Sequence, residues 1–392
     1  MRMRIPSVAA AAAILLTLSC TDRQQSPIAP TGPLQARSGG PKLKSISVTP
    51  SAATLSVGQS AQLTATPSPA SAPAAIAWSS SNSAVASVSA TGLVTAIAVG
   101  SATIAATSGS IAGTSAITVI ATPPPGDVVF VGAGDIASCS SSGDEATAAL
   151  LDGIAGAVYN LGDNAYESGT ATEFANCYDP TWGRHKARTR PSAGNHEYNT
   201  VGASGYYGYF GAAAGDPSKG YYSYDLGTWH IIVLNSNSSC TTVSCAAGSA
   251  QETWLRADLA ANSKACTLAY WHHPRFNSGS SHGNNTAVAP FWNALYELGA
   301  DVILNGHEHV YERFGPQTPS ATADAVSGIR QFTVGTGGRS HYTFGTIQPN
   351  SEVRNGDTYG VLKLTLKTGS YDWQFVPVAG GTFTDSGSGS CH

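Results

Sequence analysis

The sequence has few charged side chains. Asp, Glu, Lys and Arg make up 11% of its 392 residues, against about a quarter in ordinary soluble proteins. No basic run occurs and the net charge is −4, so the electrostatic footprint of a nucleic-acid-binding protein is absent and no nucleic-acid partner is expected. Beyond the N-terminal segment, no apolar run is long enough for a transmembrane helix. The many Gly, Ala, Ser and Thr residues favour an exported, β-rich protein.

The N-terminus has the pattern of a targeting segment. Arg2 and Arg4 form a basic start, and the apolar run from Val8 to Leu18 is too short for a stable membrane anchor. A small residue followed by Cys20 resembles the end of a bacterial lipoprotein signal. We therefore expect residues 1–20 to be a signal peptide, after which an acylated Cys20 tethers the protein to a membrane surface. The alternative is an ordinary signal peptide with an incidental Cys, and in both cases the protein is exported, either lipid-anchored at the cell envelope or secreted.

The first third of the chain, after the targeting segment, has the pattern of a linker and an all-β domain. Residues 21–43 are polar, with Pro and Gly, and indicate a linker. Residues 44–122 alternate short apolar runs with Ser, Gly and Pro turns, which predicts an all-β sandwich. The segment contains the runs SISVTPSAATLSVGQSAQLTATPSP and GLVTAIAVGSATIAATS, and its Trp78 is followed by Ser-rich turns. In these features it resembles the group-2 bacterial Ig-like domain over nearly its whole length.

This resemblance implies a spacer or an adhesion module. Contact with a cell surface or a polysaccharide is the partner that such a module suggests. Residues 44–122 contain no His, Asp or Glu, so we expect no chemistry in this domain.

The pattern changes after a Pro-rich linker at residues 123–127. Between residues 128 and 378 short apolar runs alternate with helical segments, which predicts an α/β domain followed by a C-terminal tail at 379–392. The predicted strands are 128–131, 157–161, 231–234, 268–271, 302–304, 332–334 and 361–366. Helices are predicted after the capping residues Ser142 and Ser249 and around 291–298.

Five short polar motifs stand at the downstream ends of these predicted strands. They are Gly134-Asp135-Ile136-Ala137, Gly162-Asp163-Asn164-Ala165-Tyr166, Gly194-Asn195-His196-Glu197, His272-His273-Pro274 and Gly306-His307-Glu308-His309. Ligands of open α/β sheets gather beyond the carboxyl ends of the strands. The carboxylates, amide, phenol and imidazoles of the motifs are ligands for hard or borderline cations. A single such motif is usually only a turn, but the five in this order indicate a metal site.

The motifs resemble those of the calcineurin-like metallophosphoesterases, and among them the purple acid phosphatases, over about residues 128–378. The general family has a His where this chain has Ala137, whereas the purple acid phosphatases lack that His and have a Tyr at the place of Tyr166. The run GHEHVYERF at 306–314 also resembles the last motif of the subgroup. In the purple acid phosphatases this position is usually Gly, and Ala137 departs from that pattern. The resemblance implies a multidomain chain whose catalytic domain is a central two-sheet β-sandwich flanked by helices.

The resemblance also implies a dinuclear metal centre. A ferric ion would be held by Asp135, Asp163, Tyr166 and His309. Asp163 would bridge to a divalent Fe, Zn or Mn ion that is held also by Asn195, His272 and His307. Two cations about 3.5–4 Å apart clamp the attacking and leaving oxygens and bring the pKa of bound water from about 15.7 toward 7. A metal-bound hydroxide would then attack the phosphorus in line.

Other aromatic side chains have less specific roles. By resemblance His196 contacts the phosphate, and His282, ten positions after His272, protonates the leaving alcohol. The alternative for His282 is a solvated loop residue, and His273 is either a substrate contact or a spacer. A group of tyrosines is expected to pack in a hairpin of exposed strands or, alternatively, to line a substrate rim. These are Tyr206, Tyr207, Tyr209, Tyr221, Tyr222 and Tyr224.

Six cysteines follow Cys20, and an even number in an exported chain favours disulfide bonds. Cys139 and Cys177 each follow a segment with expected metal ligands and could join the two segments. Cys240 and Cys245 are close enough in sequence for a local bridge. The pairs to expect are Cys139 with Cys177, Cys240 with Cys245 and, by elimination only, Cys266 with Cys391. No C-x-x-C spacing occurs, which disfavours a metal role.

The favoured function is hydrolysis of phosphate monoesters of small extracellular molecules by an acid-phosphatase-like enzyme. A phosphodiesterase or nucleotidase on the same site is an alternative, because a fold does not fix a substrate. A surface-adhesion protein with a degenerate catalytic domain is a second alternative, which the Ig-like domain favours. The full set of ligand residues argues against it, because degenerate copies tend to lose ligands first.

Overall fold

The computed structural model describes residues 41–72, 74–121 and 126–392. The signal peptide expected at residues 1–20, most of the 21–43 linker and most of the 123–127 linker lie outside the described residues. Within the described ranges, no helix is both long and apolar enough to cross a membrane.

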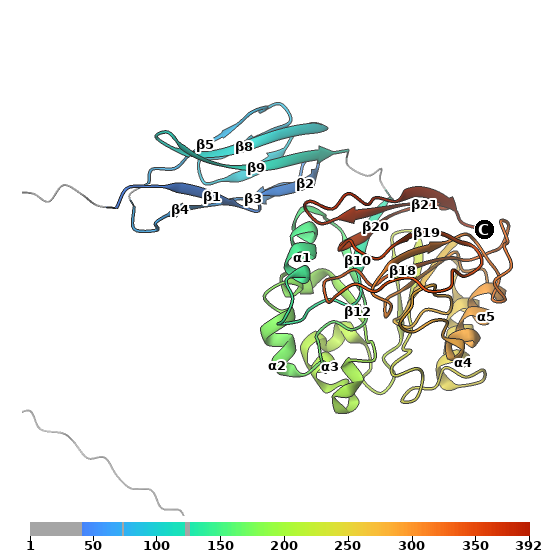
Figure 1. Ribbon diagram of the computed structural model, residues 1–392. Helices are drawn as coiled ribbons and strands as arrows, with labels where there is room; N and C mark the ends of the chain where they lie inside the picture. Colours follow the sequence, from blue (N-terminus) through green and yellow to red (C-terminus); the bar gives the residue numbers. More distant parts are fainter. Residues whose placement is uncertain (1–40, 73, 122–125) are drawn as a thin grey trace, which may run out of the picture. The chain divides into compact units, whose positions relative to one another are not determined.

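Residues 45–120 form the all-β sandwich that the alternating pattern predicts (Figure 1). The strands are β1 (Ser45–Thr49), β2 (Ala52–Ser56), β3 (Ser60–Gln62), β4 (Thr64–Ser68), β5 (Ala77–Ser80), β6 (Ala86–Val88), β7 (Leu93–Ala96), β8 (Gly100–Ser108) and β9 (Ile111–Ile120). They pair in the orders β2-β9-β8-β5, β3-β7-β6 and β1-β4. Every second residue is buried along β1, β8 and the second half of β9, so that Val48, Ile104 and Ile117 share one core.

A six-stranded sheet joins the beginning and the end of the α/β segment. Its order is β12-β11-β10-β20-β21-β22. The strands are β10 (Val128–Ala133), β11 (Ala157–Leu161), β12 (Thr189–Ser192), β20 (Gly360–Lys367), β21 (Ser370–Pro377) and β22 (Ser386–Ser390). The first three run parallel, and β20 lies antiparallel to β10. Residues 379–392, expected as a tail, contribute β22, because their alternating Ser and Gly residues carry no apolar signal for a strand.

A seven-stranded sheet has the order β13-β14-β15-β16-β18-β17-β19. Its strands are β13 (Tyr222–Leu226), β14 (Trp229–Val233), β15 (Cys266–Tyr270), β16 (Val302–Asn305), β17 (Tyr311–Phe314), β18 (Arg330–Val334) and β19 (Ser351–Asn355). The run β14-β15-β16-β18 is parallel. Both faces of β14, β15 and β16 are buried, which is why these strands are continuous apolar runs in the sequence.

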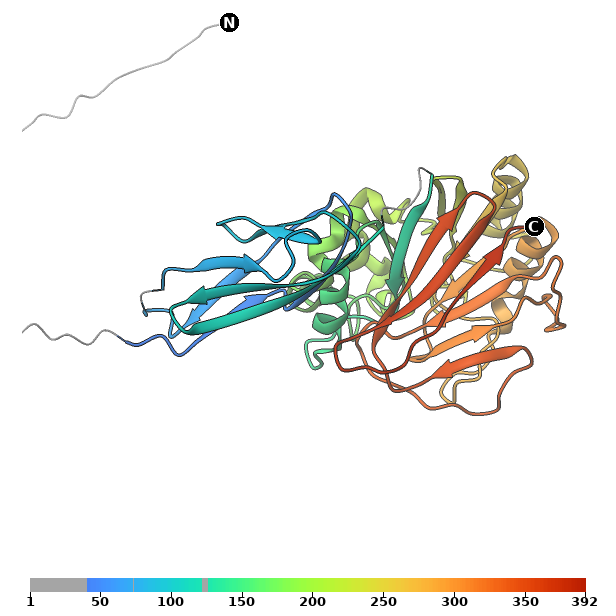
Figure 2. The same ribbon diagram turned by 90° about the horizontal axis from the view of Figure 1, so that it is seen from above.

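The two sheets face each other across the main hydrophobic core. The rings of Phe130 on β10 and Tyr270 on β15 lie 5.9 Å apart across this core. The other face of the seven-stranded sheet is covered by α4 (Ala250–Ala261) and α5 (Ala289–Glu297), in yellow and orange (Figures 1 and 2). This arrangement confirms the expected two-sheet sandwich flanked by helices.

The helix starts follow the predicted capping residues in one case and not in the other. Ser249 has extended backbone angles, and its side chain accepts the N–H of Glu252 at 3.2 Å, as expected of a cap. Ser142 precedes α1 (Gly143–Gly153), but its backbone is not extended and its side chain makes no capping hydrogen bond. Further helical turns are α2 (Ala171–Glu173), η1 (Phe174–Tyr178), η2 (Trp182–Arg188), η3 (Glu197–Asn199), η4 (Val201–Ala203), α3 (Ser204–Phe210), η5 (Gly211–Ala214) and η6 (Thr286–Val288).

The tyrosines divide between a helix and a hairpin. Tyr206, Tyr207 and Tyr209 lie on α3, so the predicted exposed strand is wrong for them. The high β-propensity of tyrosine does not decide the structure here, because these rings pack as part of a helix into an aromatic core. The Tyr206 and Phe210 rings lie 5.3 Å apart. Tyr222 does lie in the expected hairpin, where β13 pairs antiparallel with β14.

All three expected disulfides are present. They join Cys139 with Cys177, Cys240 with Cys245, and Cys266 with Cys391. The last bridge connects the end of the chain to the first residue of β15, across a sequence separation of 125 residues.

Removal of this long-range bridge is expected to destabilise the domain. Replacing both Cys266 and Cys391 by Ser should lower the free energy of unfolding by about 2–5 kcal/mol, because the unfolded chain regains the entropy of a long open loop. Denaturant unfolding of the purified protein measures the loss. The matched control replaces Cys240 and Cys245, whose separation is only 5 residues, and should cost less. An equal or larger loss in the control would contradict the loop-length argument.

Candidate metal centre

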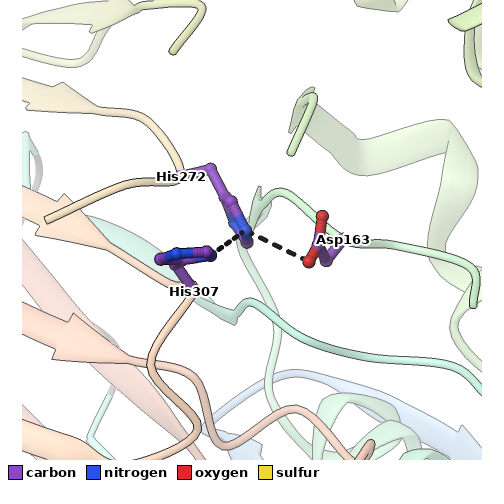
Figure 3. Close-up of side chains that lie close together, drawn as sticks. All are labelled: Asp163, His272 and His307. Carbon is purple, nitrogen blue, oxygen red and sulfur yellow. Dashed lines mark hydrogen bonds and ion pairs between the residues drawn. The ribbon is translucent and has the colours of Figure 1, made fainter. Parts of the chain in front are cut away.

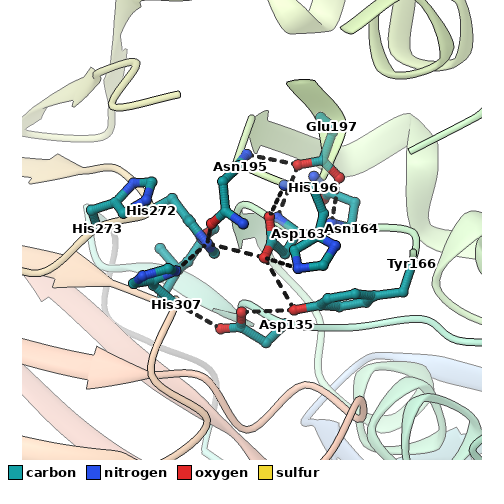
Figure 4. Close-up of polar contacts among 12 residues, drawn as sticks. Asp135, Asp163, Asn164, Tyr166, Asn195, His196, Glu197, His272, His273 and His307 are labelled. Atoms are coloured by element: carbon teal, nitrogen blue, oxygen red, sulfur yellow. Dashed lines mark hydrogen bonds and ion pairs between the residues drawn. The ribbon is translucent and has the colours of Figure 1, made fainter. Parts of the chain in front are cut away.

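Each expected metal ligand, as well as His196 and His273, follows the carboxyl end of a parallel strand. Asp135 follows β10, Asp163 and Tyr166 follow β11, Asn195 and His196 follow β12, His272 and His273 follow β15, and His307 and His309 follow β16. Because the two sheets face each other with these ends together, the loops from both sheets converge on one site (Figure 4). All five motifs therefore contribute to a single cluster, which the strand-end argument predicted.

Sharp turns bring the side chains together. The backbone φ angle is 59° at Asp135, 50° at Asp163 and 73° at His307, in the left-handed region that residues other than glycine adopt rarely. The Asp135 N–H donates to the Gly162 carbonyl at 3.1 Å, and the His307 N–H donates to Asp135 Oδ2 at 2.8 Å. Gly162 itself has φ 81°, and a Cβ there would lie 2.7 Å from Nδ1 of His272. The glycine is thus required by both conformation and space.

Four side chains form a first donor group around the Tyr166 hydroxyl. Its oxygen lies 3.0 Å from Asp135 Oδ1, 3.2 Å from Asp163 Oδ2 and 3.2 Å from His309 Nε2. Nε2 of His309 is also 3.4 Å from Asp135 Oδ1. All four side chains are buried, and none is more than 4% exposed.

A second donor group surrounds Nε2 of His272. This nitrogen lies 3.2 Å from Asp163 Oδ2, 3.0 Å from Asn195 Oδ1 and 3.2 Å from His307 Nδ1 (Figures 3 and 4). In Figure 3 the His272 ring stands between Asp163 and His307. The same Asp163 oxygen therefore belongs to both groups. The two groups contain the same residues as the two ligand sets expected from the sequence.

Neighbouring groups fix the orientation of two imidazoles. His272 donates its Nδ1 hydrogen to the Leu161 carbonyl at 2.7 Å, which turns Nε2 toward Asp163. Nδ1 of His309 lies 2.7 Å from Ser340 Oγ, and its Nε2 faces the first donor group. Such partners on the far ring nitrogen hold the tautomer that a metal ligand needs.

The cluster perturbs the protonation of its members. Burial alone would raise the pKa of Asp163, but the His272 and His196 side chains hold that pKa well below its usual range. Burial would lower the pKa of His272, whereas the Asp163 carboxylate raises it to about 9. Burial and then the Asp135 and Asp163 carboxylates raise the pKa of Tyr166 far above its ordinary value. Burial and the neighbouring imidazoles lower the pKa of His307 well below normal.

These donors fit a pair of cations. Each group offers carboxylate oxygen and imidazole nitrogen atoms whose lone pairs converge on a buried point, an arrangement that is costly unless a positive charge balances it. The first group adds a phenol, which suits a hard trivalent ion, and the second adds an amide oxygen.

The three additional histidines lie around the donor groups. His196 donates its backbone N–H to Asp163 Oδ1 at 2.9 Å and its Nδ1 hydrogen to the Glu167 carbonyl at 2.6 Å. His282 is on the loop before η6, with its ring centroid 4.0 Å from that of His307. His273 is 2% exposed and its Nδ1 lies 2.8 Å from Ser236 Oγ, which favours its role as a spacer behind His307.

Two buried glutamates support the site and were not singled out from the sequence. Both carboxylate oxygens of Glu197 accept backbone hydrogen bonds, from Asp163 at 2.9 Å, Gly194 at 2.6 Å and Asn164 at 2.7 Å. Glu197 therefore clamps the third motif onto the second. Burial and the nearby Asp163 carboxylate raise the pKa of Glu197 to about 7.

Glu308 plays a similar part for the loop that carries His282. It is fully buried and accepts the backbone N–H groups of Ser281 at 3.0 Å and His282 at 3.1 Å, as well as the Asn277 amide at 2.8 Å. Nδ1 of His282 lies 3.1 Å from the same carboxylate. Both glutamates stand inside motifs that the sequence had marked, next to expected ligands, and that position was the available signal.

Residues 339–342 also border the site, and no motif indicated them. The Arg339 guanidinium lies 5.1 Å from the ring centroid of Tyr166 and forms an ion pair with Glu167. The Tyr342 ring is stacked on His309, with centroids 4.1 Å apart and planes 7° from parallel. Their only sequence signal is the Gly-rich run that precedes them.

Comparison with known proteins identifies both domains. Residues 42–119 match the model of the bacterial Ig-like domain (group 2), and residues 120–311 match that of the calcineurin-like phosphoesterases. This chain carries a calcineurin-like phosphoesterase domain. Purple acid phosphatase 15 of Arabidopsis thaliana is 30% identical over 105 residues, which are 26% of this chain and 19% of that protein. Purple acid phosphatase 23 of the same plant is 31% identical over 176 residues, 40% of this chain and 37% of its own length.

These matches span well under half the length of the curated relatives. An uncharacterised protein of Mycobacterium tuberculosis is 26% identical over 204 residues, covering 42% of this chain and 38% of that protein. Among solved structures, a purple acid phosphatase from yellow lupin seeds superposes with a TM-score of 0.54 at 17% identity, over 88% of this chain and 69% of that chain. GAP50, the anchor in the inner membrane complex of Plasmodium, gives a TM-score of 0.51 at 12% identity, over 68% and 89%. At these identities the structures show a shared fold.

Glu197→Gln tests the clamp in the phosphoesterase domain. The amide offers one acceptor in place of two and sets an N–H₂ group against backbone N–H groups, so the motif loops should separate. We expect metal affinity to fall about 10- to 100-fold, as measured by calorimetric titration of the metal-free protein. Glu297→Gln, on the exposed surface of α5, is the matched control and should leave the affinity unchanged. Equal affinities in the two variants would refute the clamp.

Proposed function

We propose that this protein is an exported phosphatase that hydrolyses phosphate monoesters of small molecules at a dinuclear metal site. The observation that carries the proposal is the place of Asp163 Oδ2, which is 3.2 Å from the Tyr166 hydroxyl and 3.2 Å from His272 Nε2. One carboxylate oxygen common to two donor groups suits a ligand that bridges two cations. The purple acid phosphatase relatives support a phosphate ester as the substrate.

The donor chemistry suggests which metal each group takes. Fe(III) would be held by Asp135, Asp163, Tyr166 and His309. A divalent Fe, Zn or Mn ion would be held by Asp163, Asn195, His272 and His307. When bound, such a pair stabilises the charge of the phosphoryl oxygens and lowers the pKa of water. The site's own side chains must then place the ester and handle its protons.

His196 and His282 are placed for those tasks. The Nδ1 hydrogen of His196 is used by the Glu167 carbonyl, so its Nε2, 3.8 Å from Asp163 Oδ2, is the atom directed to a bound phosphate. Nδ1 of His282 faces Glu308, so its Nε2 is the atom that can donate a proton to the leaving alcohol. The His282 side chain is 37% exposed, which lets a substrate reach it.

The choice between monoester and diester is tested by direct comparison. At mildly acidic pH the purified protein should hydrolyse a chromogenic phosphate monoester about tenfold or more faster than the matching diester. The reason is that the additional negative charge of a monoester is stabilised by the cations and by the histidine hydrogen-bond donors around the site. His282→Ala should lower kcat for alkyl monoesters about 100-fold, and less for nitrophenyl esters, whose leaving group needs no proton. A preference for the diester would make the same site a phosphodiesterase.

The bridging role of Asp163 gives a second test. Asp163→Ala removes an oxygen from both donor groups, so hydrolysis should fall to background and the protein should lose both metal ions in elemental analysis. Asp225→Ala, an exposed carboxylate on β13, should keep both ions and full activity. Retention of one ion and substantial activity in the Asp163 variant would contradict a shared ligand.

We also propose that the chain is exported, with Cys20 as its lipid anchor. Three disulfides support an oxidising compartment. In that setting the Ig-like domain would act as a spacer or contact the cell surface, and the phosphoesterase domain would act on small esters outside the cytoplasm.

A further inference from the structure

A hollow of about 330 Å³ lies directly beside the second donor group. Its lining includes His282 and His307 from the site, and Ser239, Asn284, Asn285 and Thr286 from outside it. This volume is at the lower end of the range for small-molecule sites, which is roughly 300–1,000 Å³. It is enough for one small organic group.

The position of the hollow relates it to the leaving group. His307 Nδ1 belongs to the second donor group, 3.2 Å from His272 Nε2, and His282 stacks beside His307 with ring centroids 4.0 Å apart. An ester whose phosphate lies at the donor groups, with its alcohol oxygen near His282, must direct the rest of its alcohol into this space. This step rests on the proposed function.

The chemistry of the lining selects among alcohols. Apart from the two histidines, its side chains are hydroxyls, carboxamides or very small groups, and none of the lining residues that the structure describes is Asp, Glu, Lys, Arg, Phe, Tyr or Trp. A nucleobase prefers an aromatic surface on which it can stack. A second phosphate prefers Arg or Lys. Hydroxyl and carboxamide groups instead pair with the hydroxyl groups of a polyol.

Several contacts form these walls in advance. The Asn285 amide donates to Ser239 Oγ at 3.3 Å, and its oxygen accepts the Ala287 N–H at 2.9 Å. The Asn284 amide donates to Gln348 Oε1 at 2.9 Å. Each carboxamide nitrogen has a second hydrogen available for a ligand. The Cys240–Cys245 disulfide begins at the residue after Ser239 and restrains the chain on that side of it.

We propose that this hollow is the leaving-group subsite and that it selects small hydroxylated alcohols, such as those of sugar or polyol phosphates. Ser239 and Thr286 are specificity residues in this assignment. Thr286 is exposed and lines the hollow, and the cap of η6 is supplied by Asn285 and not by Thr286.

The test compares two esters with the same skeleton. A hexose phosphate esterified on its primary hydroxyl is compared with cyclohexylmethyl phosphate, which has a ring of the same size without hydroxyls. We expect kcat/KM to favour the hexose ester about tenfold or more, since a few neutral hydrogen bonds each contribute roughly three- to tenfold. Thr286→Val and Ser239→Ala should each lower this ratio about three- to tenfold.

Thr242→Val is the matched control, because Thr242 is exposed three residues after Ser239 but is outside the hollow. It should leave the ratio unchanged. A readout that does not depend on metal is saturation-transfer NMR of a free hexose with protein from which a chelator has removed the metal ions. The saturation-transfer signal of the hexose should weaken in Thr286→Val and persist in Thr242→Val. Equal rates for the two esters, or a ratio that neither variant alters, would overturn the subsite while monoester hydrolysis stands. Absence of all monoester hydrolysis would overturn the proposed function and this inference together.

Discussion

The site is organised around the sharing of one buried carboxylate. Asp163 is 2% exposed, and its Oδ2 joins the Tyr166 group to the His272 group. An ionised carboxylate in such a place is unfavourable unless partners compensate it. Its other oxygen accepts the His196 N–H, and its own N–H is held by Glu197. Asp163 therefore helps to position the loops after β11 and β12, and the same side chain carries the buried negative charge that bound cations would balance.

The buried parts of the fold were predictable from sequence. Strands such as β11 and β16 are covered on both faces, so they appear as apolar runs that end at Gly162 and Gly306. The residues after them were found because a polar side chain at such an end has few structural reasons to be there. Their grouping into two donor sets depended on family resemblance, since no spacing rule states which strand ends meet.

Other features left weaker signals. The strand β22 consists of Ser and Gly and owes its place to pairing with β21, which is a tertiary effect. The buried glutamates Glu197 and Glu308 act through backbone N–H groups, and such bonds leave no periodic pattern. The walls of the hollow beside His282 come from separate segments of the chain, at Ser239, at 282–287 and at His307. The polar residues of these loops resemble those of any surface loop, so the sequence did not indicate a hollow.

The six-stranded sheet places the last strands of the chain against the first strand of the domain, for β20 pairs with β10 and the closing bridge reaches from Cys391 to Cys266. The consequence concerns the order of folding. Contacts of such long sequence separation form late, because the entropy cost of closing the loop comes before the strand pairing stabilises it. A chain that emerges from a membrane pore with its N-terminus first cannot complete this sheet until its final residues have crossed. If the chain is exported as proposed, the domain remains open during passage and completes its metal-binding edge only on the far side of the membrane.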